Sequence, residues 1–532
     1  MKKITRVCPY CGTECRLSLV ADNGRDFLTP APRLTQPMIR YQKGGKFTPV
    51  TWEEAIRYTA RRLNEIKNQY GPHAIMAATA SRESGNETHF LMQKFARAVL
   101  CTNNIDCAAR AGHGPSATGL RDTLGNGVMS NAINDIENST CLLMFGYDCA
   151  AAHPVVARRV IRAWQNGARI ILCDARCAET ERIADLHLPL SHGGNMALVN
   201  AFGYVLLEEE LYDKAYVTRY TEGLDAYREI VKDYAPEATE HLTGLPAARV
   251  RQAMRTFAAA PSATIMWGTG VTRSGQALDV VKGLVTLALL TGNLGRESVG
   301  VGPVHSQNNL QGACDMGALP DQFPGYQPVS DPAVRAKFAH AWQIDPQQMD
   351  DQPGPRITEV PRLMLEGKIK AGYIMGDTPL HSGADGQGLS ALDFLVVQET
   401  AMTQTAAMAD VLLPAMSRAE QEGVLTCADR GFRRFEQATK PAGNVKRDWE
   451  IISLLATEMG YPMHYDNARQ IWDEIRELCP LFYGVTYEKM GKMGHIQWPC
   501  PTLDHSGTRY LYKHNHFDTP SGKGRLFAAQ MQ

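Results

Sequence analysis

The sequence lacks any excess of charge of one sign: among 532 residues, 55 Lys and Arg nearly balance 56 Asp and Glu. A bulk positive field that would favour nucleic acid or an anionic membrane is therefore excluded, and any anion site must come from local geometry. The sequence also lacks an apolar run near the roughly 18 residues of a transmembrane helix. Its start, MKKITRVCPY, lacks the apolar stretch of a secretory signal. We therefore expect neither a membrane span nor a nucleic-acid partner.

A disulfide framework is missing as well. The 13 cysteines are odd in number and mostly scattered through apolar segments, which fits thiols in a reducing compartment and predicts a cytoplasmic location. Three thiols do stand together, because Cys8, Cys11 and Cys15 follow the spacing C-x2-C-x3-C. Such a group is typical of a metal cage, which usually takes four ligands. No further cysteine occurs before Cys101, so the sequence lacks the expected fourth ligand.

The motifs of common nucleotide sites are absent too. The segment GTGVTRSG at 268–275 spaces its glycines as G-x-G-x-x-x-x-G, which differs from the G-x-G-x-x-G of nicotinamide-binding proteins. No Walker A pattern occurs either. A standard dinucleotide or ATP site is therefore excluded.

What the sequence does contain is an alternation of short apolar runs and helical segments. The helical segments are 154–166 and one that ends at Leu290, and the apolar runs are 141–145, 169–173, 263–267, 372–375 and 393–397. Buried strands that alternate with helices predict an α/β fold with parallel, doubly wound sheets covered on both faces. Each run meets a small or polar residue at its carboxyl end, where such sheets bind ligands. The alternative is that each of these residues only turns the chain out of its strand.

Two further segments give local predictions. The segment TWEEAIRYTARRLNEIKNQYG at 51–71 predicts a helix. Thr51 is expected to cap it, Glu54 to complete a capping box, and Gly71 to end it in a left-handed conformation. The loop at 300–326, rich in Gly, Asn, Gln and Pro, is long enough to predict a functional role.

Longer stretches carry a resemblance over essentially the whole chain. They are SRESGNETHFLMQKFARAVLCTNNIDC at 81–107, HGPS at 113–116, QNNLQGACDMGALPD at 307–321 and ADVLLPAMSRAEQEGVLTCADRGFRRF at 409–435. Through them the chain resembles the molybdopterin oxidoreductases, and within these the catalytic subunits of formate dehydrogenases. Those enzymes carry molybdenum or tungsten on a bis(molybdopterin guanine dinucleotide) cofactor.

The resemblance implies a domain organisation. Two Rossmann-like domains would each hold one dinucleotide arm, the first built from residues 33–107 and 308–419 and the second from 108–307. Residues 1–32, with parts of 420–532, would form a remnant iron–sulfur domain. The family continues with a C-terminal barrel-like domain that caps the pterins, and we expect that domain to be absent here.

The resemblance also assigns residues to the cofactor. One arm would be lined by Gly146, Tyr147, Asp174, Arg176, Gly194 and Asn195. The other arm would be lined by Gly268, Gly270, Gly376, Asp377, Gln398, Thr403 and Asp410, and the floor between the arms by Gln307, Asn308, Asn309 and Gln311. Glycine turns let backbone N–H groups approach a diphosphate, carboxylates accept from guanine, and amides bond pterin heteroatoms. The alternative for the amides is a loop that bonds only to itself.

The iron–sulfur segment departs from the family pattern. In the family a fourth cysteine completes the ligands of a [4Fe–4S] cluster, and a lysine bridges cluster and pterin. Both are missing from this sequence. The three remaining thiols would hold a labile or three-iron cluster, adventitious zinc, or nothing.

The catalytic positions depart as well. The cysteine or selenocysteine that ligates the metal in formate dehydrogenases is replaced by Gly112, which we interpret as a turn glycine in a Gly/Pro-rich loop. The arginine that pairs with formate is replaced by His305, which lacks the bidentate fork that fits a carboxylate. His113, the proton acceptor beside the metal, is retained.

Three hypotheses about function follow. In the first, the chain oxidises formate to carbon dioxide and passes electrons through an iron–sulfur cluster to a small iron–sulfur subunit and a hydrogenase, as in formate hydrogenlyase and other anaerobic respiration. In the second, it is a catalytically impaired paralogue that keeps the fold. In the third, it is an incomplete or altered gene product with no independent role.

Overall fold

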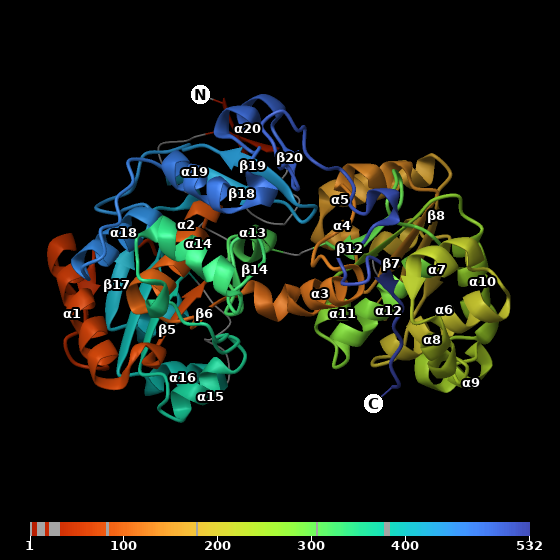
Figure 1. Cartoon of the computed structure of the whole chain (residues 1–532), viewed down its shortest axis with the longest axis horizontal. Helices are drawn as coiled ribbons and strands as arrows, with labels where there is room; N and C mark the ends of the chain where they lie inside the picture. Colours follow the sequence, from red (N-terminus) through yellow and green to blue (C-terminus); the bar gives the residue numbers. More distant parts are fainter. Residues whose placement is uncertain are drawn as a thin grey trace.

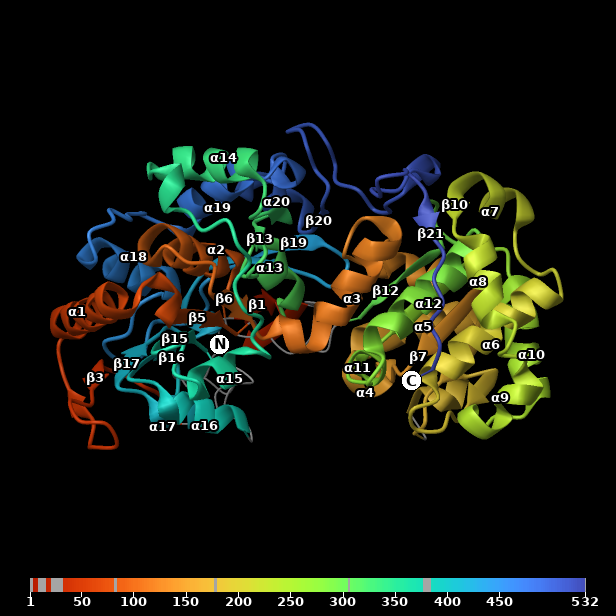
Figure 2. The same cartoon turned by 60° about the horizontal axis from the view of Figure 1, so that its bottom comes forward.

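The computed structural model of the chain describes residues 3–7, 16–20, 32–80, 84–176, 179–304, 307–376 and 384–531. The described chain forms two lobes with one long helix, α3 (Ala109–Leu124), lying between them (Figure 1). The view turned by 60° keeps this arrangement (Figure 2). Among the described residues, no helix is long and apolar enough to cross a membrane.

The first lobe is built on a sheet made from two distant parts of the chain. Its seven strands run in the order β4 (Thr48–Pro49), β3 (Met38–Ile39), β17 (Val411–Pro414), β16 (Phe394–Glu399), β15 (Ala371–Met375), β5 (Ile75–Thr79) and β6 (Ile105–Cys107). The strands from β17 to β6 are parallel, and only β3 and β4 are antiparallel. The sheet is therefore completed only when residues around 371–414 join those around 38–107.

Helices cover both faces of this sheet. Ile75 and Ala77 face a cluster with α1 (Trp52–Tyr70), α2 (Asn86–Lys94) and α18 (Asp448–Glu458). Met76 and Ala78 face the opposite cluster, which includes residues of α15 (Val360–Leu365), α16 (Ala384–Ala391) and α17 (Gln404–Met408). Strand side chains alternate between the two clusters, which explains why these strands read as continuous apolar runs.

The second lobe contains a five-stranded sheet that is parallel throughout. Its order is β12 (Gly300–Pro303), β11 (Ala263–Trp267), β7 (Cys141–Phe145), β8 (Arg169–Cys173) and β9 (Leu186–Leu188). One face packs on α5 (Pro154–Gln165), and the other on α6 (Asn195–Glu208), α10 (Ala247–Ala258) and α12 (Ala277–Leu290). The smaller helices of this lobe are α4 (Cys149–Ala152), α7 (Lys214–Tyr220), α8 (Leu224–Val231), α9 (Pro236–Thr243) and α11 (Thr269–Thr272).

A third layer joins the lobes at the top of Figure 1. It is a three-stranded antiparallel sheet of β18 (Gly423–Thr426), β19 (Gly431–Phe435) and β20 (Ile496–Gln497), with helices α19 (Ala468–Leu478) and α20 (Tyr487–Met493) beside it. The remaining elements are α13 (Leu310–Asp315), β13 (Gln322–Phe323), β14 (Gln327–Pro328), α14 (Pro332–Trp342), the hairpin β1 (Lys3–Val7) with β2 (Arg16–Val20), and β10 (Thr221–Glu222) paired with β21 (Gly524–Arg525).

The α/β fold class predicted from the sequence is confirmed. The predicted strands 141–145, 169–173 and 263–267 have the observed bounds. The helix predicted at 51–71 is α1, and its Thr51 hydroxyl accepts from the Glu54 N–H at 3.2 Å. The Glu54 carboxylate accepts from the Tyr41 hydroxyl at 2.7 Å, so the side chain does not turn back to complete a capping box. The division into domains stays a prediction, and most of residues 1–32 lie outside the described residues.

Candidate functional site

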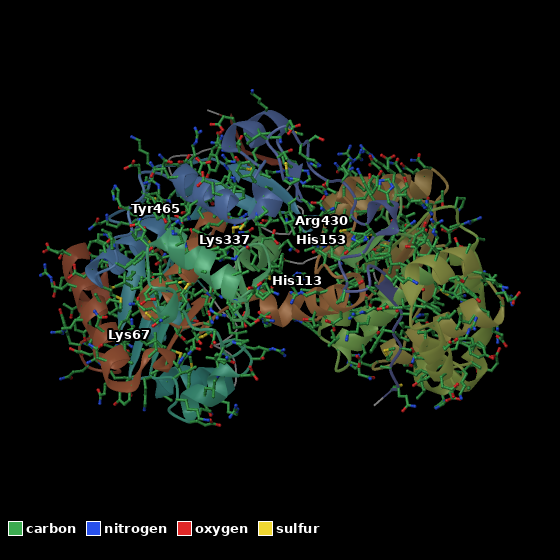
Figure 3. All side chains as sticks on the ribbon, in the orientation of Figure 1. Lys67, His113, His153, Lys337, Arg430 and Tyr465 are labelled. Atoms are coloured by element: carbon green, nitrogen blue, oxygen red, sulfur yellow. The ribbon has the colours of Figure 1, made fainter. Side chains whose placement is uncertain are left out.

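Gly112 and His113 lie in the first turns of α3, between the two lobes (Figure 3). Our interpretation of Gly112 as a turn glycine in a loop is therefore wrong. The Gly and Pro content suggested a loop, but Pro115 lies inside α3, where it removes one helical hydrogen bond and packing against α12 keeps the segment helical. A Cβ atom added to Gly112 would have no heavy atom within 4 Å. The position thus has room for a side chain and lacks one.

Contacts with the second lobe fix the orientation of α3. The indole Nε1 of Trp267, at the end of β11, donates to the Ser116 hydroxyl at 2.9 Å. One turn further on, a Cβ at Gly119 would approach Val281 of α12 to 2.6 Å, so only glycine lets the two helices lie this close. Gly112 consequently faces a small cavity that Trp267 and Gly268 also line.

His113 is fully buried and lines a cavity of about 120 Å³. The other lining residues are Arg110, Gly114, Ala117, Thr118, Arg121, Cys314, Leu319, Asp321, Tyr326 and Arg356. Counting Asp106, which pairs with Arg110, three guanidinium groups stand against two carboxylates, so the cavity keeps a local positive charge although the whole chain is nearly neutral. A small anion would be attracted to such a site.

The position of Arg110 is set by two carboxylates. Its Nε lies 3.1 Å from Asp106 Oδ2, and its second terminal nitrogen lies 3.5 Å from Asp321 Oδ1. Burial opposes the charge, but these two neighbours hold the pKa of Arg110 above its usual value. Burial also raises the pKa of Asp106 to about 6 despite the ion pair. Arg110 is therefore a permanently charged group fixed beside His113.

The segment predicted as a loop at 300–326 closes one side of this cavity, but it contains β12, α13 and β13, so the loop prediction is only partly correct. Gln311 donates from Nε2 to Asp315 Oδ1 at 2.7 Å, and Tyr326 donates to the same oxygen at 2.8 Å. Burial raises the pKa of Asp315 to about 6. Gln311 Oε1 is buried and accepts no hydrogen bond from any described residue. A buried acceptor without a donor is costly, so this atom is suited to a donor from a ligand.

The floor amides do not all point to a ligand. Asn309 donates from Nδ2 to Ser84 O at 3.0 Å and accepts from the Thr426 N–H at 2.8 Å, so its amide is used within the protein. Gln307 and Asn308 lie on the same loop, with Asn308 fully buried. Asn309 is therefore bonded to distant parts of the chain, whereas Gln311 bonds within its own segment and keeps one buried acceptor that suits a ligand.

The glycines at the carboxyl edge of the five-stranded sheet pack on one another. The Gly270 N–H donates to Gly146 O at 3.2 Å, and a Cβ on Gly146 would lie 2.9 Å from the Gly270 backbone. A Cβ on Gly268 would lie 3.0 Å from Gly146 O and from Tyr147 Cδ2. The structure thus places Gly268 and Gly270 beside Gly146, at a different sheet from Gly376, with which the resemblance grouped them. Because β11 pairs directly with β7, its loop belongs to the same edge as Gly146.

The other residues assigned to this arm lie along the same edge. The Asp174 carboxylate holds Arg176 through both oxygens, with Oδ1 to Nε at 3.1 Å and Oδ2 to the terminal nitrogen at 3.1 Å. Asp174 is buried, whereas the Arg176 side chain is 70% exposed. Gly194 and Asn195 begin α6, whose first turn has no side-chain cap. Uncapped N–H groups at the start of a helix suit a phosphate.

The seven-stranded sheet brings together fewer of its assigned residues. Gly376, with φ +75°, follows β15, and Thr403 caps α17 by accepting from the Ala406 N–H at 3.1 Å. Gln398 lies within β16, and its amide is bonded to Tyr373 and Asp448. Asp410 precedes β17 and accepts from the Leu395 N–H at 2.8 Å, so it lies at the amino edge. The structure therefore does not bring Asp410 to the carboxyl edge where we expected it.

Five of the assigned residues lie outside the described part of the chain. They are Cys8, Cys11, Cys15, His305 and Asp377. Conversely, the sequence interpretation missed Arg121 and Arg356. Arg110, Gly114, Ala117 and Arg121 recur at helical spacing, which would have signalled one face of a helix had α3 been predicted. Arg356 joins them from a loop more than 200 residues away.

Comparisons with known proteins agree over nearly the whole chain. Residues 33–458 match the family model described as molybdopterin oxidoreductase. Formate dehydrogenase H of Escherichia coli (strain K12) is 51% identical over 99% of this chain and 78% of its own length. The F420-dependent formate dehydrogenase subunit alpha of Methanocaldococcus jannaschii is 37% identical over 99% of this chain and 81% of its own length.

A solved structure is similar at the level of the fold. Acetylene hydratase from Pelobacter acetylenicus matches with a TM-score of 0.77, covering 99% of this chain and 78% of that chain. The two sequences are only 19% identical, so this likeness concerns the arrangement of the elements alone.

Proposed function

Because the chain belongs to the molybdopterin oxidoreductase family, we propose that it acts as a formate dehydrogenase, converting formate to carbon dioxide, a proton and two electrons. The family membership implies a molybdopterin cofactor with molybdenum. The observation that carries the choice of formate is the arginine-lined cavity around His113, since formate is a small anion.

The residues present fit the dinucleotide part of this cofactor. At the edge of the five-stranded sheet, the uncapped start of α6 offers backbone N–H groups to a diphosphate. Gln311 Oε1 is a buried acceptor that a pterin N–H would satisfy. We propose that Gly146, Asp174, Gly194, Asn195, Gly268 and Gly270 line one arm, that Gly376 and Thr403 line the other, and that Gln311 contacts the pterins.

The chain's own residues supply binding and proton transfer. When bound, the metal and its pterins would supply the acceptor for the two electrons. Arg110, Arg121 and Arg356 attract the carboxylate of formate to the cavity. His113, buried at the same cavity, accepts the proton released from the formate carbon.

One observation favours the second candidate, a catalytically impaired paralogue. Gly112 occupies the position of the metal-ligating residue, and it has no side chain to ligate with. The room around this position means that water or hydroxide would take the ligand's place. The two candidates therefore differ in whether a metal with that ligand set still oxidises formate.

The test is formate-dependent reduction of benzyl viologen under anaerobic conditions, with molybdenum measured on the same samples. We expect little activity from the unchanged chain, and no measurable increase from Gly112→Cys or His305→Arg alone. The double variant should regain activity in samples that contain molybdenum, because it restores a thiolate and places an arginine at the position that pairs with formate in the family. Loss of that activity on adding His113→Gln would support the proton-acceptor role. No activity in a molybdenum-loaded double variant would count against formate as the substrate.

The electron path is part of the same proposal. We infer that Cys8, Cys11 and Cys15 hold an incomplete iron–sulfur cluster, through which electrons reach a small iron–sulfur subunit and a hydrogenase. We also propose a cytoplasmic location, which the cysteine usage supports. Anaerobically purified protein should contain well under four irons per chain and bleach in air. A stable four-iron spectrum would mean that another residue supplies the fourth ligand.

A further inference from the structure

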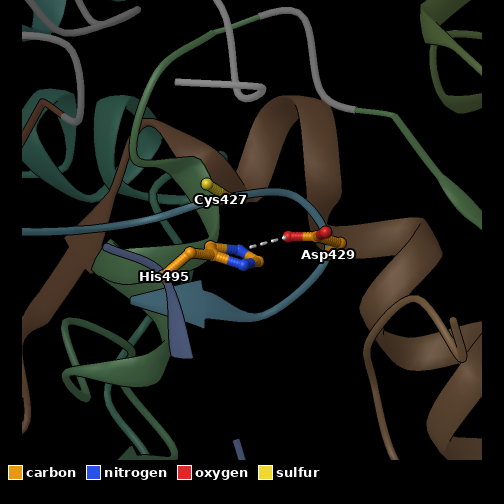
Figure 4. A group of neighbouring side chains, drawn as sticks. All are labelled: Cys427, Asp429 and His495. Atoms are coloured by element: carbon orange, nitrogen blue, oxygen red, sulfur yellow. Dashed lines mark ion pairs between the residues drawn. The ribbon is translucent and has the colours of Figure 1, made fainter. Parts of the chain in front are cut away.

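Three potential metal ligands meet in the third layer, outside the site described above. Cys427 and Asp429 lie in the turn between β18 and β19, and His495 immediately precedes β20. Because β19 pairs with β20, the turn and His495 come together although 66 residues separate His495 from Asp429. Figure 4 shows Asp429 and His495 facing each other, with Cys427 beside them.

The spacing of the ligand atoms fits a metal ion. The thiol sulfur, a carboxylate oxygen and an imidazole nitrogen all lie within 4.8 Å of one another. Asp429 Oδ1 and His495 Nε2 are 3.4 Å apart. Zn²⁺ bonds of about 2.0 Å to nitrogen or oxygen and 2.3 Å to sulfur place tetrahedral ligands roughly 3.3 to 3.8 Å apart. Small side-chain rotations would therefore close the site around an ion.

Asp429 carries an oxygen that the described residues leave without a hydrogen bond. Its Oδ2 accepts from the Ile133 N–H at 3.0 Å, whereas Oδ1 is buried and has only the ion-pair contact with His495. The whole residue is 4% exposed. At 3.4 Å the His495 contact is long for a hydrogen bond, and a buried carboxylate oxygen is costly unless a closer partner satisfies it. A bound cation between Asp429 and His495 would do so.

The backbone holds His495 in position through a close approach. The imidazole lies over Gly431, where an added Cβ atom would come within 1.6 Å of His495 Nε2. Only glycine at the start of β19 allows the ring to lie there. The His495 side chain is 22% exposed, so an ion and a water molecule can reach the site from solvent.

We propose that Cys427, Asp429 and His495 bind a divalent transition-metal ion of the Zn²⁺ class, with water as the fourth ligand. A thiolate, a carboxylate and an imidazole are ligands that Zn²⁺ prefers. The thiolate and carboxylate together neutralise the two positive charges of the ion. The adjacent Arg430 guanidinium does not compete for the ligands, because it donates to the carbonyls of Met129, Ser130, Trp498, Thr508 and Arg509.

The site would connect the third layer to the second lobe. Asp429 bonds to Ile133, and the neighbouring Ala428 packs in a cluster with Met129 and Ile133 of that lobe. An ion held by Cys427, Asp429 and His495 therefore fixes the turn that crosses the junction. The role is structural, and it does not depend on which reaction the chain catalyses.

The test uses the full chain with Cys8, Cys11 and Cys15 changed to Ser, so that the N-terminal thiols cannot bind the added metal. After chelation and dialysis, Co²⁺ is titrated and followed by difference absorption, and Zn²⁺ by competition with a chromophoric chelator. We expect one equivalent of Co²⁺ with a thiolate charge-transfer band in the near ultraviolet and d–d bands of a tetrahedral ion. We also expect Zn²⁺ to displace it.

Three variants and two controls decide the assignment. Cys427→Ser should abolish the charge-transfer band, and Asp429→Asn and His495→Gln should each weaken Zn²⁺ binding at least tenfold. Cys101→Ser and His464→Gln, which change a thiol and an imidazole elsewhere, should leave binding unchanged. The His495 variant alters a partly exposed ring, so it remains informative if a buried change prevents folding. Absence of Co²⁺ uptake by the parent chain, or uptake that none of the three variants weakens, would overturn the proposal.

Discussion

Glu87 is a carboxyl group fully enclosed at the start of α2. Its two oxygens accept from the Tyr487 hydroxyl at 2.6 Å and the Val424 N–H at 3.0 Å. Burial nevertheless raises the pKa of Glu87 to about 7, because desolvation outweighs these two hydrogen bonds. The folded state therefore holds this proton more tightly than the unfolded chain does.

The sign of the resulting pH dependence follows directly. A carboxyl whose pKa is higher in the folded state favours folding while it is protonated. Its contribution is therefore complete below the unfolded pKa of about 4.3 and is lost as the pH rises to about 7. We expect the free energy of unfolding to fall by on the order of 3 kcal/mol across this window because of Glu87, and Glu87→Gln to remove this fall. Urea unfolding at several pH values measures this pH dependence, with Glu229→Gln, at an exposed carboxylate, as control. If the pH dependence of Glu87→Gln were the same as that of the parent chain, Glu87 would not be its source.

Gly112 gives a second prediction at this scale, about stability and independent of activity. The position is helical and a Cβ atom there meets nothing within 4 Å. Gly112→Cys should therefore leave the free energy of unfolding unchanged or raise it by about 0.5 kcal/mol, since glycine is a poor helix former. Gly119→Cys is the matched control, because a side chain there collides with Val281. Chemical denaturation measures the free energy of unfolding of both variants, and labelling of the introduced thiol reports its accessibility. If Gly112→Cys were less stable than Gly119→Cys, the helical position of Gly112 would be contradicted.

At the scale of elements, the sequence predicted those whose pattern is local. The five strands and α1 follow from apolar runs and a capping residue, which depend on neighbours in the chain. Helix α3 could not be predicted in this way, because Gly112, Gly114 and Pro115 suggest a loop. Its helical form depends on packing against α12 and on the Ser116–Trp267 bond. The cavity around His113 was missed for the same reason, since Arg121 lies on α3 and Arg356 arrives from a distant loop.

The end of α3 can be tested directly. Gly125 terminates the helix with φ +85°, and a Cβ atom there would lie 2.1 Å from the carbonyl carbon of Asp518. Gly125→Ala should cost about 2 to 4 kcal/mol, because strain from the left-handed backbone adds to overlap with the C-terminal segment. Gly460→Ala, with φ +93° and open space, should cost only about 1 kcal/mol. If Gly125→Ala and Gly460→Ala lost the same free energy of unfolding in thermal or urea denaturation, the contact with Asp518 would be unimportant.

At the scale of the whole molecule, Arg430 joins the third layer to the second lobe. It is fully buried in the turn after Asp429, and its guanidinium bonds to carbonyls of Met129 and Ser130 on one side and of Trp498 on the other. Burial lowers the pKa of Arg430 to about 10, so it remains charged at neutral pH. The labelled position of Arg430 in Figure 3 lies at the junction of the lobes.

Arg430→Met should uncouple the parts that Arg430 joins. The methionine side chain fills a similar volume but leaves buried carbonyls without donors. This should lower the free energy of unfolding by about 3 to 5 kcal/mol. Because the loss falls at the junction, we expect calorimetric unfolding to separate into two transitions. Arg182→Met, at a side chain 79% exposed, should leave a single profile unchanged. If Arg430→Met instead unfolded in a single transition at a lower temperature, the lobes would still unfold as a unit without this residue.

The two-part origin of the seven-stranded sheet has a consequence for synthesis on the ribosome. Strands β5 and β6 emerge early, but their partner β15 follows only after residues 108–370 have been translated. At roughly 5–20 residues per second, this interval lasts on the order of 13 to 50 s. The five-stranded sheet lies wholly within the interval and can form while β5 still exposes an unpaired edge. The nascent chain therefore has a long period in which that edge needs shielding.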